Sequence, residues 1–408
     1  MVNRSSMAPA RQNLGPWLLL GIEPLQVHGF RQYDLRTVQT HPSHPDALGI
    51  PSCRSISGSL ESLKTFFGLL LFALLTGGGA ATYWALTPPS LSPQETAVLI
   101  RKGRTAASVL QELEERGTIA SARGIHLLGR AMRSWPRMKV GEYVIQSRMT
   151  PWQVIQVLCS GESILHSVTL REGQNMYELA DELEKRGFYS RAEILERLKS
   201  PEWSKQLASE NAPSVEGFLF PDTYQLTRVM SLDEIIQFLT RRFERAWQPE
   251  WNNRLKDLGM TRYQIVTLAS IIEKETGAAE ERPRISSVFH NRLKKRMPLQ
   301  SDPTTIYGIW ERWDGNLHHS DLVEKTPWNT YAIPALPVGP IGNPGTEALR
   351  AALFPADTDS LYFVSRNDGT HEFTPTYELH LAAVRRYQLD ARARAGKSWR
   401  DLQKKKED

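Results

Sequence analysis

An uninterrupted apolar stretch is the strongest pattern along the chain. Residues 65–86 read TFFGLLLFALLTGGGAATYWAL and contain no charged side chain. A helix of this length can cross a hydrocarbon core about 30 Å thick, and Tyr83 and Trp84 near its end suit the membrane interface. Three consecutive glycines, Gly77 to Gly79, disfavour a buried helix of a soluble protein. The pattern therefore predicts a single transmembrane helix over 65–86.

Charges on either side of this stretch predict its orientation. Arg54 and Lys64 precede it, and the next charge after it is Glu95. Because positive residues stay on the cytoplasmic side, we expect a single-pass protein of the cytoplasmic (inner) membrane, with the rest of the chain on the periplasmic or extracellular side. Residues 1–64 are rich in Pro, Ser, His and Gln without periodicity, so we expect a disordered cytoplasmic segment. A cleaved signal peptide is disfavoured, since no small-x-small cleavage site follows the stretch.

Two segments farther along have the same pattern. Residues 101–117 (RKGRTAASVLQELEERG) and 171–187 (REGQNMYELADELEKRG) each follow an alternating strand-like run and place an amphipathic helix between two glycines. The closing glycines, Gly117 and Gly187, are suited to cap the helices. The first copy continues through another helix to an alternating strand over 139–145. This strand–helix–helix–strand order resembles a LysM-type module, which binds N-acetylglucosamine polymers, although any small α/β unit gives the same pattern.

Residues 261–277 (TRYQIVTLASIIEKETG) predict a well-delimited helix. Thr261 and Gln264 form a capping box, and Gly277 is expected to end the helix in a left-handed conformation. Glu273 and Glu275 are two residues apart and so point to different sides. Counting back along the helix from each carboxylate gives two stripes: Ile272, Ile271 and Leu268 for Glu275, and the smaller, more polar Ser270, Ala269 and Val266 for Glu273.

The more apolar stripe makes Glu275 the candidate general acid. Burial and the negative end of the helix dipole both raise the pKa of a carboxyl group. A carboxyl that stays protonated near neutral pH can protonate a glycosidic oxygen. The alternative is a partly exposed residue at a helix end, paired with Lys274 or Arg282.

Two loops rich in glycine and proline, 299–309 and 328–345, supply candidate substrate contacts. Neutral donors and acceptors beside aromatic rings suit the hydroxyls and faces of a sugar. The candidates are Gln300, Asp302, Thr304, Tyr307, Asn329 and Tyr331. The alternative is that these side chains only brace the loops. A phosphate site is weak, because no lysine follows as a P-loop requires.

Composition limits the classes of protein to which the chain can belong. The 408 residues allow two or three domains at roughly 150 residues each. A net charge of +5, mixed in sign along the chain, disfavours a nucleic-acid binder. Two cysteines exclude a disulfide scaffold, and Cys53 and Cys159 on opposite sides of a membrane would not pair. The histidines lack metal-ligand spacing, so no metal and no cofactor are predicted.

Several ordered blocks resemble the YceG-like endolytic murein transglycosylases. They are SIIEKET (270–276), LQSDPTTIYG (299–308), NTY (329–331), LPVGPIGNPG (336–345), EGFLFPDTY (216–224), LYFV (361–364) and HEF (371–373). The resemblance implies a lyase that cleaves the MurNAc–GlcNAc bond of nascent peptidoglycan strands without water, leaving 1,6-anhydro-MurNAc ends. The family's catalytic glutamate matches Glu275. Peptidoglycan synthases are implied as possible partners, and the long N-terminal extension departs from the family.

We therefore expect an α+β protein with five parts: residues 1–64 cytoplasmic, 65–86 transmembrane, 87–165 a LysM-like subdomain, 166–390 a catalytic domain beginning with the second repeat, and 391–408 a charged tail. Two other functions remain open. One is a hydrolytic muramidase that uses Asp302 or Glu273 as a second carboxylate. The other is a non-catalytic peptidoglycan-binding scaffold.

Overall fold

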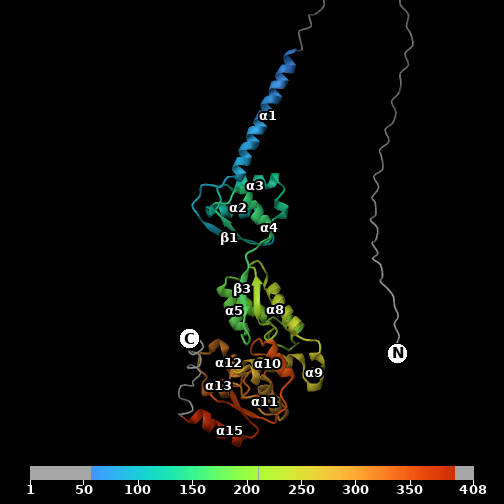
Figure 1. Ribbon diagram of the computed structural model, residues 1–408, viewed down its shortest axis with the longest axis vertical. Coiled ribbons are helices and arrows are strands. Elements are labelled where there is room, and N and C mark those ends of the chain that lie inside the picture. The colour runs from blue at the N-terminus through green and yellow to red at the C-terminus, as the bar shows by residue number, and fades with distance from the viewer. Residues whose placement is uncertain (1–56, 210, 391–408) are drawn as a thin grey trace, which may run out of the picture. The chain divides into compact units, whose positions relative to one another are not determined.

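The computed structural model describes residues 57–209 and 211–390 (Figure 1). The expectations for the first 56 residues, for Cys53 and for the tail 391–408 lie outside them. By internal contacts the chain divides into two compact units, Met1–Leu70 and Leu71–Asp408. The second unit holds every element after the first helix.

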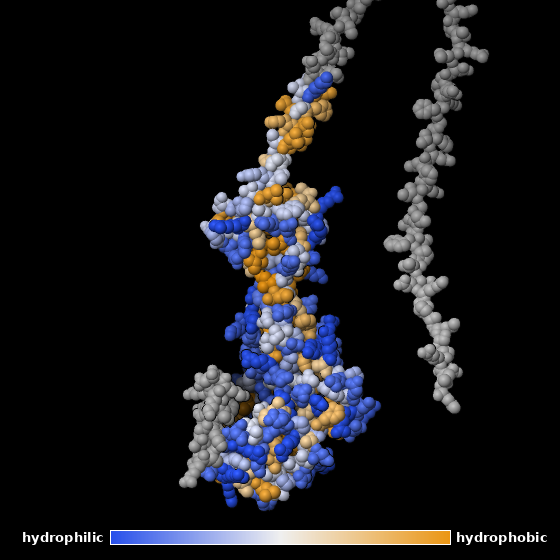
Figure 2. Space-filling model, in the orientation of Figure 1, coloured by the Kyte–Doolittle hydropathy of each residue, from blue (hydrophilic) through white to orange (hydrophobic). Residues whose placement is uncertain are grey.

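Helix α1 (Ser57–Leu86) contains the predicted apolar stretch. Its part Ser62–Leu86 is long and apolar enough to cross a membrane, and an 18-residue stretch within it has no buried residue. Side chains such as Leu69, Phe72 and Leu75 are about two-thirds exposed, and Figure 2 shows apolar colour on the middle of the helix. A core helix of a soluble protein would be buried, so the structure agrees with the prediction of one apolar N-terminal helix.

The first repeat forms a strand–helix–helix–strand unit followed by a helix. It comprises β1 (Glu95–Ile100), α2 (Ala106–Glu115), α3 (Ala122–Ala131), the 3-10 turn η1 (Trp135–Arg137), β2 (Gly141–Gln146) and α4 (Pro151–Ser160). The strands are antiparallel, with Glu95 opposite Gln146. The turn after β1 needs Gly103, whose φ is +91°. Val98, Leu110 and Ile155 lie in a core confined to this unit.

The second repeat has the same order with one insertion. It comprises β3 (His166–Leu170), α5 (Met176–Lys185), α6 (Arg191–Leu198), the inserted α7 (Pro201–Leu207), β4 (Asp222–Leu226) and α8 (Leu232–Ala246). Here too the strands are antiparallel, with His166 opposite Leu226. Gly173 and Gly187 adopt positive φ, as Gly103 and Gly117 do in the first copy. The duplicated α/β pattern is thus present in three dimensions.

The remaining chain is mostly helical and contains one β-hairpin before its last helices. Its elements are α9 (Trp251–Leu258), α10 (Arg262–Glu275), η2 (Ala279–Glu281), α11 (Arg282–Lys294), α12 (Asp302–Gly308), η3 (Trp310–Arg312), α13 (His319–Val323), α14 (Thr346–Leu353), β5 (Tyr362–Ser365), β6 (His371–Thr374), α15 (Tyr377–Val384) and the π-turn η4 (Arg385–Leu389). Helix α10 is central, because every residue from Ile265 to Ile272 is buried.

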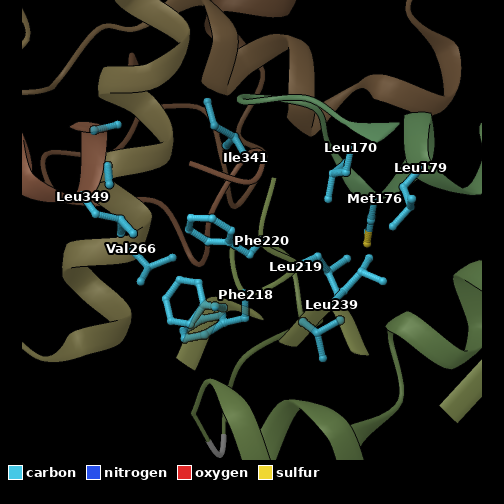
Figure 3. Close-up of a cluster of buried hydrophobic side chains, with 14 of the residues drawn as sticks. Leu170, Met176, Leu179, Phe218, Leu219, Phe220, Leu239, Val266, Ile341 and Leu349 are labelled. Atoms are coloured by element: carbon cyan, nitrogen blue, oxygen red, sulfur yellow. The ribbon is translucent and has the colours of Figure 1, made fainter. Parts of the chain in front are cut away.

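One hydrophobic core joins the second repeat to these helices. In Figure 3, Leu170 and Met176 of the repeat lie on the side of Leu219 and Leu239, whereas Phe218 and Phe220 lie toward Val266 of α10 and Leu349 of α14; all belong to one core. Three two-stranded antiparallel sheets occur in the described chain. The mixed α+β class is confirmed, whereas the domain boundaries at 87, 166 and 390 stay predictions.

Candidate active site

Helix α10 begins as the sequence indicates but ends differently. The Thr261 side chain accepts a hydrogen bond from Gln264 N, and the Gln264 side chain accepts one from Thr261 N, which completes the capping box. The prediction of a left-handed Gly277 is wrong, because Gly277 is not among the glycines with positive φ. The helix ends at Glu275, and its cap residue Thr276 has φ −89° and ψ 112°. Gly277 instead allows close approach, because a Cβ there would lie 3.0 Å from the Gly369 carbonyl oxygen.

The two carboxylates at the end of α10 have different surroundings. Glu273 is 6% exposed and is neutralised by Arg282, whose Nη2 lies 3.0 Å from Glu273 Oε1. Its other oxygen accepts a hydrogen bond from Gly345 N at 2.9 Å. The alternative in which Arg282 pairs with Glu275 does not occur, because Arg282 pairs with Glu273. Glu273 therefore holds the helix end in place.

Glu275 instead lines a cavity of about 290 Å³. Its Oε1 accepts a hydrogen bond from the Ser301 hydroxyl at 2.5 Å. The residues that share the lining are Arg292, Leu299, Gln300, Asp302, Tyr331, Phe363 and His380. Segments before α12, after α13 and in α15 thus meet around the end of α10.

The cavity raises the pKa of Glu275 to about 7, chiefly because burial disfavours the carboxylate. The Ser301 hydrogen bond lowers this pKa, the negative charge of Asp302 raises it, and Arg292 lowers it. Burial also lowers the pKa of Arg292. At neutral pH the carboxyl can therefore both donate and accept a proton.

Three of the six predicted substrate residues share this cavity with Glu275. The Tyr331 hydroxyl donates to Asp302 Oδ1 at 2.6 Å, and burial with this contact raises the pKa of Tyr331. Gln300 accepts a hydrogen bond from Arg292 Nη1 at 3.3 Å. The φ of Gln300 is +52°, which is costly for any residue other than glycine, and such strain is common at functional sites.

The other three lie in the interior and are not brought to the cavity. Thr304 bonds to the Ser301 carbonyl and Thr330. Asn329 donates to three carbonyls of the segment 321–324 and accepts from Thr305. Tyr307 donates to Glu216. Each of these polar groups forms its hydrogen bonds with protein atoms. This agrees with the alternative that the side chains brace their segments.

Two polar cavity residues, Arg292 and His380, were not singled out from sequence, nor was Ser301, which bonds to Glu275. Ser301 lies inside the block LQSDPTTIYG, so its place between Gln300 and Asp302 was the available signal. Arg292 is 8% exposed and its guanidinium donates to the Leu361 and Leu299 carbonyls, a contact invisible in the helix pattern. His380 comes from α15, which lies far along the chain.

A second buried carboxyl lies outside the cavity. Glu216 accepts hydrogen bonds from Met176 N, the Tyr307 hydroxyl and the Asn343 amide. Burial raises its pKa to about 7. Since all three partners are parts of the fold, Glu216 connects the second repeat to α12 and to the loop before α14.

The fold and this cavity define an α+β protein with a carboxyl group of raised pKa in a polar and aromatic cavity. The described residues contain no group of three or more His, Cys, Asp or Glu that could hold a metal ion. The model of the YceG-like family matches residues 98–386, and the chain belongs to this family.

The similarity to known proteins extends over most of the chain. The endolytic murein transglycosylase of Bacillus subtilis is 30% identical, over 76% of this chain and 90% of its own. A protein of that name from Streptococcus pneumoniae serotype 2 is 24% identical, over 73% of this chain, which spans 60% of the pneumococcal one. The crystal structure of a yceG-like protein from Listeria monocytogenes, 27% identical, covers 72% of this chain and all of its own, with a TM-score of 0.50.

Proposed function

We propose that this chain is an endolytic murein transglycosylase, a lyase that cleaves peptidoglycan glycan strands. The observation that carries the proposal is the position of Glu275, a carboxyl with a pKa of about 7 in a cavity lined by hydrogen-bonding and aromatic side chains. The similar relatives that bear this name support it.

In this proposal Glu275 acts first as acid and then as base. Its proton passes to the glycosidic oxygen between MurNAc and GlcNAc as that bond breaks and positive charge develops at C1 of MurNAc. The carboxylate then takes the proton of the MurNAc C6 hydroxyl, whose oxygen bonds to C1. The products are a 1,6-anhydro-MurNAc end and a free GlcNAc 4-hydroxyl, and Glu275 is protonated again.

Neighbouring groups fit both stages. Ser301 orients the carboxyl through its hydrogen bond, and Arg292 stabilises the carboxylate that forms after proton donation. Gln300 and Tyr331 are proposed to position the sugar from the cavity wall. Thr304, Tyr307 and Asn329 are proposed to support that wall from behind.

A water-using muramidase is the second candidate, because Asp302 shares the cavity with Glu275. Two carboxyls around one glycosidic bond are the usual hydrolytic arrangement. Glu273 is a poor partner for this role, since Arg282 and Gly345 occupy its oxygens.

End-group analysis of digested peptidoglycan distinguishes the candidates. We expect 1,6-anhydro ends from the native protein, none from Glu275→Gln, and anhydro ends still from Asp302→Asn. Reducing MurNAc ends from the native protein would replace the lyase with a muramidase. Unchanged anhydro product from Glu275→Gln would remove Glu275 from the chemistry, and absence of any native product would favour the scaffold.

We also propose that α1 anchors the chain in the cytoplasmic membrane with the cavity on the outer side. The apolar segment Ser62–Leu86 supports anchoring, and Lys64 near its N-terminal end supports the orientation. The two strand–helix–helix–strand units are proposed to act as LysM-like contacts to the glycan. Synthases that make nascent strands are the proposed partners.

A further inference from the structure

Three aromatic rings form a continuous surface beside the catalytic cavity. The Tyr362 ring of β5 stacks on His380 of α15, with centroids 5.1 Å apart and planes inclined by 21°. Tyr377, at the start of α15, lies 5.8 Å from Tyr362 and 6.4 Å from His380. Because His380 lines the cavity and Tyr377 is 54% exposed, the rings lead from the cavity wall to the surface.

Local structure fixes these rings in place. The Thr376 side chain accepts a hydrogen bond from Leu379 N and so sets where α15 begins. Tyr377 and His380 are three residues apart and share one side of the helix. Behind them, the Arg292 guanidinium lies 5.2 Å from the Tyr362 centroid. This packing pre-orders the surface before any ligand arrives.

His380 adds a polar group that the fold leaves unused. Its Nδ1 is buried and finds no hydrogen-bond partner among the described residues. Burial and the charge of Arg292 lower the pKa of His380, so the ring is neutral at pH 7. A neutral imidazole presents one donor and one acceptor, and because Nδ1 is buried the nitrogen that a sugar hydroxyl would meet is Nε2.

We propose that Tyr377 and His380, backed by Tyr362, form a further sugar-binding subsite at the edge of the cavity. It takes one residue of the glycan strand beyond those that flank the cleaved bond, with a sugar face on Tyr377 and a hydroxyl at His380. Aromatic walls with a few placed polar groups are what such sites require. This subsite rests on the proposed function, because its ligand is the same strand.

The test measures how binding depends on oligomer length. The full-length variant Glu275→Gln, which should bind without turnover, is titrated in detergent with a tetrasaccharide and with an octasaccharide of alternating GlcNAc and MurNAc. Calorimetry gives the affinity for each. We expect added Tyr377→Ala to weaken octasaccharide binding about tenfold and to leave tetrasaccharide binding unchanged. Tyr377→Phe keeps the ring and should bind as the parent does.

A matched control lies on the same helix. Leu379 is 53% exposed, close to the exposure of Tyr377, but is aliphatic, so Leu379→Ala should change neither affinity. Equal affinities of the parent and Tyr377→Ala for the octasaccharide, or an equal loss for both oligomers, would overturn the subsite alone. If Glu275→Gln binds neither oligomer and the native protein releases no anhydro ends, the proposed function and the subsite fail together.

Discussion

At the residue scale, the end of α10 shows how position sets the chemistry of a carboxyl group. Glu273 and Glu275 are two residues apart on one helix. Glu273 is paired with Arg282 and bonded to the backbone of Gly345. Glu275 faces a cavity with one hydroxyl donor, and burial raises its pKa to about 7. In the proposed mechanism Glu275, which lines the cavity, is therefore the carboxyl that exchanges a proton with the substrate.

The raised pKa of Glu275 predicts a pH dependence. Proton donation needs the neutral acid, so kcat/KM should fall as pH rises through about 7, by about tenfold for each further pH unit. The check is the initial rate of anhydro-end release between pH 5 and 9. A rate that stays level to pH 9 would contradict the role of acid.

Replacing Ser301 with alanine should move that profile. The Ser301 hydroxyl favours the ionised carboxylate, so Ser301→Ala should raise the pKa of Glu275 and shift the alkaline limb to higher pH. Loss of orientation should also lower kcat by about tenfold or more. Ser301→Thr retains the hydroxyl and serves as the control. A lowered kcat with an unshifted limb would assign Ser301 a merely structural role.

Two carboxyls with raised pKa values also predict how stability varies with pH. Glu216 and Glu275 hold their protons more tightly in the folded chain than in the unfolded chain. The stability they contribute is fully present below about pH 4.5 and is lost as pH rises through about 7. Urea unfolding in detergent should show a loss on the order of 1–3 kcal/mol between pH 5 and 8.

The variant Glu275→Gln should reduce that loss, because it removes one of the two titrations. Glu216→Gln should instead destabilise the fold at every pH by about 1–3 kcal/mol, since an amide cannot accept all three hydrogen bonds that Glu216 accepts. A native protein whose stability is constant from pH 5 to 8 would refute both raised values.

At the element scale, α10 supports the site because it is surrounded. Its residues Ile265 to Ile272 are all buried, including the small and polar stripe assigned to Glu273. Burial therefore does not separate the two stripes. What distinguishes the carboxylates is the element each meets past the helix end: α11 and the start of α14 for Glu273, and the segment before α12 for Glu275.

The start of α10 offers a prediction independent of catalysis. Thr261→Ala removes the capping box, which should cost about 1 kcal/mol in the free energy of unfolding. The turnover of the folded protein should stay the same, because the cap and Glu275 lie at opposite ends of the helix. Urea unfolding and rate measurement at the same temperature check both parts, with Thr261→Ser as control. A large fall in rate without loss of stability would contradict this separation.

At the scale of the whole molecule, the repeats differ in what they pack against. The first copy encloses its own core around Leu110 and Ile155. The second shares one core with α10 and α14, in which Leu170, Val266 and Leu349 take part (Figure 3). The second copy is thus structurally part of the unit that carries Glu275, and Glu216 reinforces this connection through Tyr307.

Charged substitutions in the apolar helix should release the chain from the membrane. Leu74→Lys with Leu75→Lys places two charges in the middle of the candidate span, at about 2.5–3.5 kcal/mol each. The native chain should stay in the membrane pellet after alkaline extraction, and the double variant should be released. Leu74→Ala with Leu75→Ala is the matched control. Release of the native chain would refute anchoring.

The sequence by itself determined the local features of this protein. The apolar run of α1, the two repeated strand–helix units and the capping box of α10 depend on neighbours within a few residues. Periodicity, caps and charge-free length act over that range, so they can be seen without a structure.

Only the tertiary structure decided which loop side chains reach the cavity. Gln300, Asp302 and Tyr331 line it, whereas Thr304, Tyr307 and Asn329 lie inside the fold, although the same two segments, 299–309 with α12 and 328–345, supply both groups. Arg292 and His380 join Glu275 from α11 and α15. Such contacts connect residues far apart in sequence and depend on how helices pack. That packing reflects shape and burial summed over the whole core, which no local pattern records.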